Sequence, residues 1–424
     1  GGWQSISNPN SFEAISGIAE VNLHAYHALE DARSLLSDRF RRAFSDVENE
    51  ICIANTDNHD FSGWITIPLN CLRGEYKAVK NKETGEISVL EQSNGGGAYA
   101  RPTSMAELTD EHESTDYADN IAGYDVRFWV NRLPANTVSH FEACTEYDAV
   151  PDVQMMLKGI RVNADGWPET ICYNGFEESM IQPGFADFIG VTEEVLAPRW
   201  SMIDMFDEID PVKREQLRSA LVQKNATYGK TLRTESEHDI RFEQPMYYNS
   251  LDWAKRILVV NKHEAKAKLA IRMRRKDNPQ PELYYLQLNV SDTKELPTVS
   301  LVNHEFVPGR DQIPNTCMDY HTCDGWIRYE KAGTSWSVYS EDAPMLTFGK
   351  PNCFARIQQM DEHMEKPLFM LFDNTWDTNF VCNESGRFVY QFDILQTKNP
   401  ADKCTDAVAM ATKPAVLVKM RNQK

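Results

Sequence analysis

The densest group of side chains with chemical potential lies between positions 371 and 380, where the sequence is LFDNTWDTNF. Carboxylates and carboxamides form paired hydrogen bonds with vicinal hydroxyls, and an indole offers a flat apolar face to a sugar ring. The candidate carbohydrate-binding residues are therefore Asp373, Asn374, Trp376, Asp377 and Asn379. The same letters also suit an ordinary turn, because Asp and Asn cap their own backbone. The pattern alone leaves both interpretations open.

Catalytic residues cannot be assigned from this segment. The carboxylates of Asp373 and Asp377 could serve as acid and base in glycoside hydrolysis. The sequence around them, however, gives no sign that the pKa of either one is shifted. A P-loop, a G-x-G-x-x-G loop, a G-x-S-x-G elbow and an H-E-x-x-H helix are all absent from the sequence. Whether the chain is an enzyme is therefore left open.

The best metal-ligand spacing is found in Cys317, His321 and Cys323, which strand alternation would place on one side. Structural zinc sites usually have two paired arms of ligands, and no second arm is evident here. His24 and His27 are neighbours on a predicted helix, without a carboxylate at a spacing that would complete a site. We therefore assign no metal ligand to this chain.

These side chains would be positioned mainly by β-strands. Alternating apolar residues occur at 64–67, 126–130, 266–274, 284–288 and 388–394, separated by clusters of Gly, Pro, Asn and Asp. Residues 266–274 predict a basic outer face over an apolar inner face, and an apolar strand over 367–372 leads into the candidate segment. The predicted fold class is mainly β, with a large antiparallel β-sandwich.

Helices are predicted in two places. Apolar residues at steps of three and four between Ser11 and Glu48 form one stripe, with Ser11 as the N-cap. A second helix is expected to begin at Asp210-Pro211 and to run through Leu217 and Leu221. The acidic stretch 106–120 is interpreted as a solvated loop.

Composition limits the classes of partner. The 424 residues include 44 Lys and Arg against 63 Asp and Glu, which gives a net charge of −19. Neutralising phosphates requires clustered basic residues, so the charge argues against nucleic acid. No apolar run reaches the roughly 18 residues of a membrane-spanning helix, so no membrane partner is expected. A homo-oligomer and the cellular compartment are left open.

Several motifs occur in an order that resembles the C-terminal region of glycoside hydrolase family 38-like proteins, the α-mannosidase superfamily. They are RFEQPM at 241–246, PGRDQIP at 308–314, DGW at 324–326 and DNTWDTNF at 373–380, preceded by IANTDNHDFSGW at 53–64 and FWVNRLP at 128–134. The resemblance covers roughly residues 12–396, and none of these motifs is catalytic.

The resemblance implies a helical segment over 1–50, a small β-sandwich domain over 51–145 and a large super-sandwich of the galactose-mutarotase type over 146–424. In the family, a preceding (β/α)₇ barrel carries Zn²⁺ and an Asp nucleophile. Neither is found here, so zinc is expected in the missing barrel and no cofactor in this chain. The implied function is that of the C-terminal part of an α-mannosidase-type glycosidase, which supports the substrate pocket through the segment containing Asn374, Trp376 and Asn379 and is inactive alone.

The implied partners are a carbohydrate and the missing catalytic barrel or a partner subunit that supplies it. Two alternatives remain beside this interpretation. The chain could be a free-standing carbohydrate-binding sandwich that uses Trp376 and other exposed aromatic residues. It could also be an enzyme of another kind built on a similar sandwich, such as a polysaccharide lyase, for which the sequence alone places no catalytic constellation.

Overall fold

The computed structural model describes most of the chain's strands but not all of its residues. The described residues are 50–56, 60–68, 76–92, 125–147, 155–193, 212, 221–278, 282–301, 304–314, 316, 318, 320–351, 360, 362–374, 384–398 and 414–419, with helical positions scattered from 16 to 38. They divide into two compact units, one within 1–153 and 412–424, the other within 154–378 and 382–411. Each unit is described by itself.

The first unit is a small β-sandwich of two antiparallel sheets. A five-stranded sheet has the order β26-β1-β7-β3-β4, and a three-stranded sheet has the order β2-β6-β5. The strands are β1 (Glu50–Asn55), β2 (Phe61–Pro68), β3 (Ala78–Asn81), β4 (Ile87–Val89), β5 (Glu91–Gln92), β6 (Asp125–Leu133), β7 (Thr137–Cys144) and β26 (Ala415–Lys419).

Alternation along these strands builds the small core. Ile51 and Ile53 on β1 and Ile65 and Ile67 on β2 are buried together with Phe128 of β6. The strands predicted over 64–67 and 126–130 are therefore confirmed as β2 and β6. On the other face of these strands, the Arg127 guanidinium stacks over the Trp64 ring at 4.0 Å.

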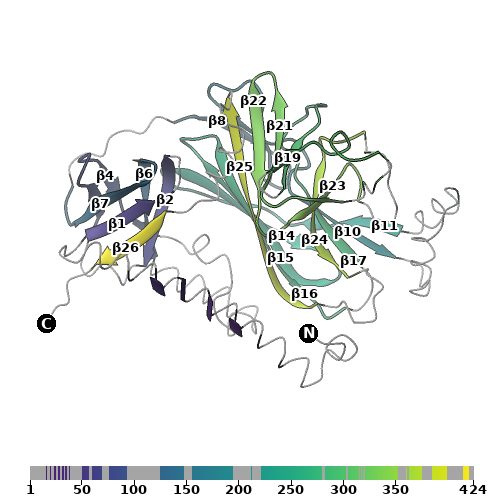
Figure 1. Cartoon of the computed structure of the whole chain (residues 1–424), viewed down its shortest axis with the longest axis horizontal. Helices are drawn as coiled ribbons and strands as arrows, with labels where there is room; N and C mark the ends of the chain where they lie inside the picture. Colours follow the sequence, from purple (N-terminus) through teal and green to yellow (C-terminus); the bar gives the residue numbers. More distant parts are fainter. Residues whose placement is uncertain are drawn as a thin grey trace. The chain divides into compact units, whose positions relative to one another are not determined.

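The second unit is a large antiparallel sandwich. Its ten-stranded sheet runs β12-β14-β15-β16-β25-β22-β21-β18-β19, with β13 paired to β14, and its six-stranded sheet runs β11-β10-β17-β24-β23-β20. Figure 1 shows β15, β16 and β25 as long, curved neighbours. The strands of the ten-stranded sheet are β12 (Thr227–Tyr228), β13 (Leu232–Glu235), β14 (Asp239–Tyr247), β15 (Leu251–Asn261), β16 (Lys266–Arg275), β18 (Thr298–Leu301), β19 (His304–Phe306), β21 (Trp326–Lys331), β22 (Thr334–Tyr339) and β25 (Gly386–Lys398).

The six-stranded sheet supplies the opposite layer. Its strands are β10 (Asp187–Glu193), β11 (Leu221–Asn225), β17 (Glu282–Gln287), β20 (His321–Thr322), β23 (Met345–Phe348) and β24 (Pro367–Asp373). A separate two-stranded ribbon pairs β8 (Leu157–Val162) with β9 (Pro168–Tyr173).

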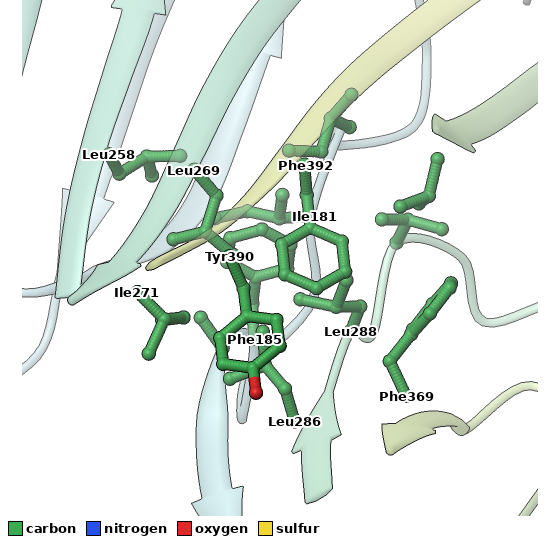
Figure 2. Packing of buried hydrophobic residues seen from close by; sticks show 14 of the residues in the cluster. Ile181, Phe185, Leu258, Leu269, Ile271, Leu286, Leu288, Phe369, Tyr390 and Phe392 are labelled. Carbon is green, nitrogen blue, oxygen red and sulfur yellow. The ribbon is translucent and has the colours of Figure 1, made fainter. Parts of the chain in front are cut away.

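The main core fills the space between the two large sheets. Leu269 and Ile271 of β16 and Phe392 of β25 meet Leu286 of β17 and Phe369 of β24, as Figure 2 shows. All five side chains are almost fully buried. Because each strand alternates, the same β16 turns Lys266, Lys268, Arg272 and Arg274 outward, and the basic face predicted over 266–274 is confirmed.

Strand β17 departs from simple alternation. All residues from Glu282 to Leu286 are buried, because β17 is central in its sheet and a second apolar cluster covers its other face. Leu283 and Tyr285 contribute to that cluster, together with Ile189, Val191 and Leu368. The sequence indicated only the inner set of this strand.

The two predicted helices have different outcomes. The described positions between 16 and 38 are helical, and Val212 is helical as well. Leu221, however, begins strand β11, so the helix predicted through Leu221 is wrong at that end, where the chain pairs with β10. The predicted loop 106–120 lies outside the described residues. Among the described helical positions, no helix is long and apolar enough to span a membrane.

The division of the chain differs from a simple linear order. The resemblance implied a large sandwich over 146–424. In the structure, β26 pairs antiparallel with β1 of the small unit, from Glu50 opposite Lys419 to Ala54 opposite Ala415. Pairing with β26 satisfies the outer N–H and C=O groups of β1, which would otherwise form an open strand edge.

Candidate functional site

The candidate segment begins where β24 ends. Asp373 is the last residue of that strand and is half-buried, and Asn374 follows it with an exposed fraction of only 5%. Trp376, Asp377 and Asn379 lie outside the described residues. The structure therefore locates the base of the segment and two of its five candidate residues.

Asn374 connects β24 to the start of β17. Its Oδ1 accepts a hydrogen bond from the backbone N–H of Glu282 at 2.6 Å, and its own N–H donates to the Glu282 carbonyl at 3.2 Å. Its Nδ2 donates to the carbonyl of Asn278 at 3.5 Å. Because the side chain is buried and bound to backbone, Asn374 anchors the segment.

A buried charged network supports the same end of the sandwich. The side chains of Arg275 and Glu282 are 0% and 6% exposed, with Nη2 of Arg275 3.4 Å from Oε2 of Glu282. The Tyr284 hydroxyl donates to the same Oε2 at 2.8 Å and lies 2.6 Å from Ser250 Oγ. A buried ion pair is tolerated only when further hydrogen bonds satisfy both partners, and this network supplies them.

Arg275 also binds the backbone of two neighbouring chain segments, one before β17 and one before β25. Its Nη2 donates to the carbonyl of Asn278 at 2.7 Å, and its Nη1 donates to the carbonyl of Glu384 at 2.9 Å. Its guanidinium stacks over the ring of Phe372, at the end of β24, with 4.2 Å to the centroid. One cation therefore ties together the ends of β16 and β24, the chain before β17 and the chain before β25.

Two tyrosines complete this end of the sandwich. Burial, with a smaller contribution from the Glu282 carboxylate, raises the pKa of both Tyr248 and Tyr284, so both hydroxyls keep their protons. The rings pack edge to face at 5.7 Å. Within the described part of the chain, the Tyr248 hydroxyl is buried without a hydrogen-bond acceptor. It is the one donor of this group that the network leaves available.

Two of the three residues with metal-ligand spacing, His321 and Cys323, lie within the described part of the chain. Cys317 lies outside the described residues, and Cys323 belongs to the main core. The His321 ring lies between Phe306 and Phe348, at centroid distances of 6.2 and 5.7 Å. Burial lowers the pKa of His321 to about 4 and raises that of Cys323 to about 11. His321 is thus a neutral side chain packed among aromatic rings.

His24 lies on an exposed helical position, 3.9 Å from the carboxylate of Glu20 one turn earlier.

The sequence pattern did not predict that Arg275 and Glu282 form a buried ion pair. A signal for Arg275 was present, because it continues the inner-face series that runs through Leu269, Ile271 and Met273. A charged residue at an inner position indicates a buried partner, but its identity depends on a strand pairing that the local sequence does not reveal.

No protein-family model matches the chain, and no curated protein matches its sequence. An α-mannosidase from Enterococcus faecalis V583 matches with a TM-score of 0.58 at 8% identity, over 97% of this chain and 51% of that chain. A glycosyl hydrolase family 38 protein from Enterococcus faecalis matches with a TM-score of 0.60 at 8% identity, over 95% of this chain and 52% of that chain.

The chain has a glycosidase-related fold. The predicted resemblance to the β-rich portion of family 38-like proteins is confirmed at the level of the fold, as is the predicted mainly β, antiparallel sandwich class. This chain spans about half the length of the two matched chains. At 8% identity the likeness concerns the fold alone, so no residue role follows from it.

Proposed function

We propose that this chain is the C-terminal helical and β-sandwich part of a family 38-like, α-mannosidase-type glycosidase, and that it is inactive alone. The observation that carries the proposal is the asymmetry of coverage, because nearly all of this chain matches only about half of each α-mannosidase-type chain. A separate region, either on the same polypeptide or in a partner subunit, would then supply the catalytic groups, and zinc would be bound there.

In this proposal, the segment that begins at Asn374 approaches the substrate pocket formed by the catalytic region. The buried contacts of Asn374 and Arg275 support this role, because they hold the base of the segment and the chain at Glu384 against the sandwich. A rigid base reduces the conformational entropy lost when a loop orders around a ligand. Trp376 and Asp377 would then contact the sugar from that base.

Hydrolysis of aryl α-mannosides tests this proposal. The purified chain should release no aryl alcohol with or without added Zn²⁺, and activity should appear when the barrel region encoded by the same or a neighbouring gene is co-expressed. Trp376→Ala should then reduce kcat/KM of the reconstituted enzyme, with Trp253→Ala, which changes a tryptophan on the outer face of β15, as the matched control. Efficient turnover by the purified chain alone would contradict the proposal.

A further inference from the structure

Two histidines from neighbouring turns face each other at one end of the ten-stranded sheet. His238 lies in the turn between β13 and β14, and His263 lies in the turn between β15 and β16. Nδ1 of His238 is 2.9 Å from Nε2 of His263, with 5.0 Å between the ring centroids. The two residues are 25 positions apart, so no local motif marks the pair.

The turn that carries His238 is closed by Ser236. The Ser236 hydroxyl oxygen accepts the backbone N–H of His238 at 3.2 Å and that of Asp239 at 3.1 Å, and the hydroxyl donates to Oδ1 of Asp239 at 2.9 Å. Bonds of this kind between a side chain and nearby backbone fix a turn locally. His238, which is only 9% exposed, is therefore held in place before any ligand arrives.

The turn that carries the half-buried His263 is fixed in a similar way. Oδ1 of Asn261 accepts the backbone N–H of His263 at 2.7 Å and that of Glu264 at 2.9 Å. The two turns are also bonded to each other, because the N–H of Lys262 donates to the carbonyl of His238 at 2.8 Å. A rigid pair of turns reduces the entropy lost when side chains gather around a ligand.

The charged groups around the pair are matched with one another. Nζ of Lys262 lies 2.6 Å from a carboxylate oxygen of Glu235 and donates to the Ser236 carbonyl at 2.6 Å. Lys266 forms an ion pair with Glu264. Because the Lys262 cation is compensated in this way, it opposes the approach of a second cation only weakly.

Glu237 supplies a carboxylate beside the two imidazoles. The residue is exposed, and one of its carboxylate oxygens lies within 4.8 Å of a ring nitrogen of His238. Two imidazoles and one carboxylate are a ligand set that Zn²⁺ takes in proteins, with a position left for water. Hard cations such as Ca²⁺ and Mg²⁺ prefer oxygen ligands throughout, so the two nitrogens argue against them.

The distance between the two nitrogens suits ligands of one ion. A Zn–N bond is about 2.0–2.1 Å long, so two nitrogens on one ion are about 2.9 Å apart at a right angle and about 3.3 Å apart at the tetrahedral angle. The 2.9 Å between His238 and His263 is at the short end of this range. A small rotation of the half-buried His263 ring would open it to the tetrahedral value.

A hydrogen bond between the two rings is the alternative to a bound ion. One ring then donates a proton to the other, and that ring must change tautomer before both nitrogens can offer a lone pair to a metal. The proton moves to the second nitrogen of the same ring, so two neutral imidazoles bind an ion without losing a proton.

We propose that His238, His263 and Glu237 form a site for a divalent transition-metal ion, with Zn²⁺ as the ion that fits this ligand set. The bound ion would join the turn before β14 to the turn before β16 and so clamp this end of the sheet. The inference is independent of the proposed function, because all three ligands belong to the large sandwich and none to a catalytic region.

Isothermal titration calorimetry of the full chain with Zn²⁺, after treatment with EDTA and dialysis, tests this inference. Zn²⁺ should bind with a Kd in the micromolar range, and His263→Ala should weaken that binding at least about tenfold. Glu237→Gln should weaken it less, because the two nitrogens remain. His304→Ala, which removes an exposed histidine on β19, is the matched control and should bind as the unchanged chain does.

Thermal melts separate the loss of a ligand from the loss of the fold. Zn²⁺ at about 100 times its Kd should raise the melting temperature of the unchanged chain by about 5–10 °C. His263→Gln keeps a hydrogen-bonding side chain at this position, so it should melt near the unchanged chain without Zn²⁺ and should lack the rise with Zn²⁺.

Two results would overturn the inference. One is equal affinity for Zn²⁺ in the unchanged chain and in His263→Ala, which would place the ion elsewhere. The other is a Kd weaker than about 1 mM, which would mean that the two rings are joined by a hydrogen bond only. The hydrolysis of aryl α-mannosides by the reconstituted enzyme is a separate measurement, so the two proposals fail separately.

Discussion

Replacing Arg275 by methionine should destabilise the large sandwich strongly. The substitution leaves Glu282, with a 6% exposed side chain, without its cation, and it removes the donors to the carbonyls of Asn278 and Glu384. Breaking a buried ion pair in this way costs about 3–5 kcal/mol. In a unit of about 250 residues, about 1 kcal/mol lowers the melting temperature by about 2–4 °C, so Arg275→Met should lower it by roughly 10 °C.

The matched control is Arg274→Met, one residue earlier on β16. Arg274 is on the outer face, is one-third exposed and lies 3.5 Å from Asp252, so its removal should cost less than about 1 kcal/mol. Thermal melts and urea denaturation followed by tryptophan fluorescence measure both variants. An effect of Arg275→Met no larger than that of Arg274→Met would refute the account of the buried network.

A double variant refines the same prediction. Arg275→Met with Glu282→Gln removes both charges, so the double variant should be more stable than the sum of the two single effects predicts, by at least about 1.5 kcal/mol. It should not recover fully, since two backbone carbonyls still lack the donors that Arg275 supplied. Additive single effects would mean that Arg275 and Glu282 are not coupled.

Three further predictions follow from other contacts. Asn374→Ala should lower the free energy of unfolding by about 1–3 kcal/mol, measured by urea denaturation, because the buried N–H of Glu282 loses its acceptor; an unchanged midpoint would argue that this contact is absent. His321 has a folded-state pKa of about 4 against a usual 6.5, so the unfolded chain binds the proton more readily and stability should be lost as the pH falls from about 6.5 to 4. The loss should approach about 3 kcal/mol and disappear in His321→Phe, and equal slopes of stability against pH in the two proteins would contradict it. Burial raises the pKa of Cys323 to about 11, so iodoacetamide at pH 8 should alkylate the half-buried Cys172 before Cys323, as mass spectrometry of peptides can show. Faster labelling of Cys323 would mean that the chain between β20 and β21 is open to solvent.

The sequence pattern was sufficient to predict strands that have one apolar and one polar face. Over 266–274 of β16 the apolar and basic residues alternate, and the structure buries the apolar set and turns the basic set toward the outer face. On β17 both faces are buried, so alternation carried no information about the outer one. Leu221 shows a related limit, since its spacing fits a helix but pairing with β10 makes it a strand residue.

The buried charges could not be predicted because their partners are remote in the sequence. Arg256 pairs with Asp187, and Arg275 meets Glu282 and the carbonyl of Glu384, through contacts that only the assembled sheets create. Asn374 shows the same limit for the candidate site. Its type fits a ligand contact and a backbone anchor equally well, and its backbone contacts exist only because β17 lies beside it.

The pairing of β26 with β1 has a consequence for biosynthesis. Glu50 emerges from the ribosome long before its partner Lys419, and the whole large sandwich is translated between them. Until then, β1 has β7 on one side and an open edge on the other, a state that favours pairing with foreign strands. Strand β1 is thus synthesised long before the strand that covers its edge. Nascent chains interrupted before residue 415 would leave that edge of β1 unpaired and prone to aggregation.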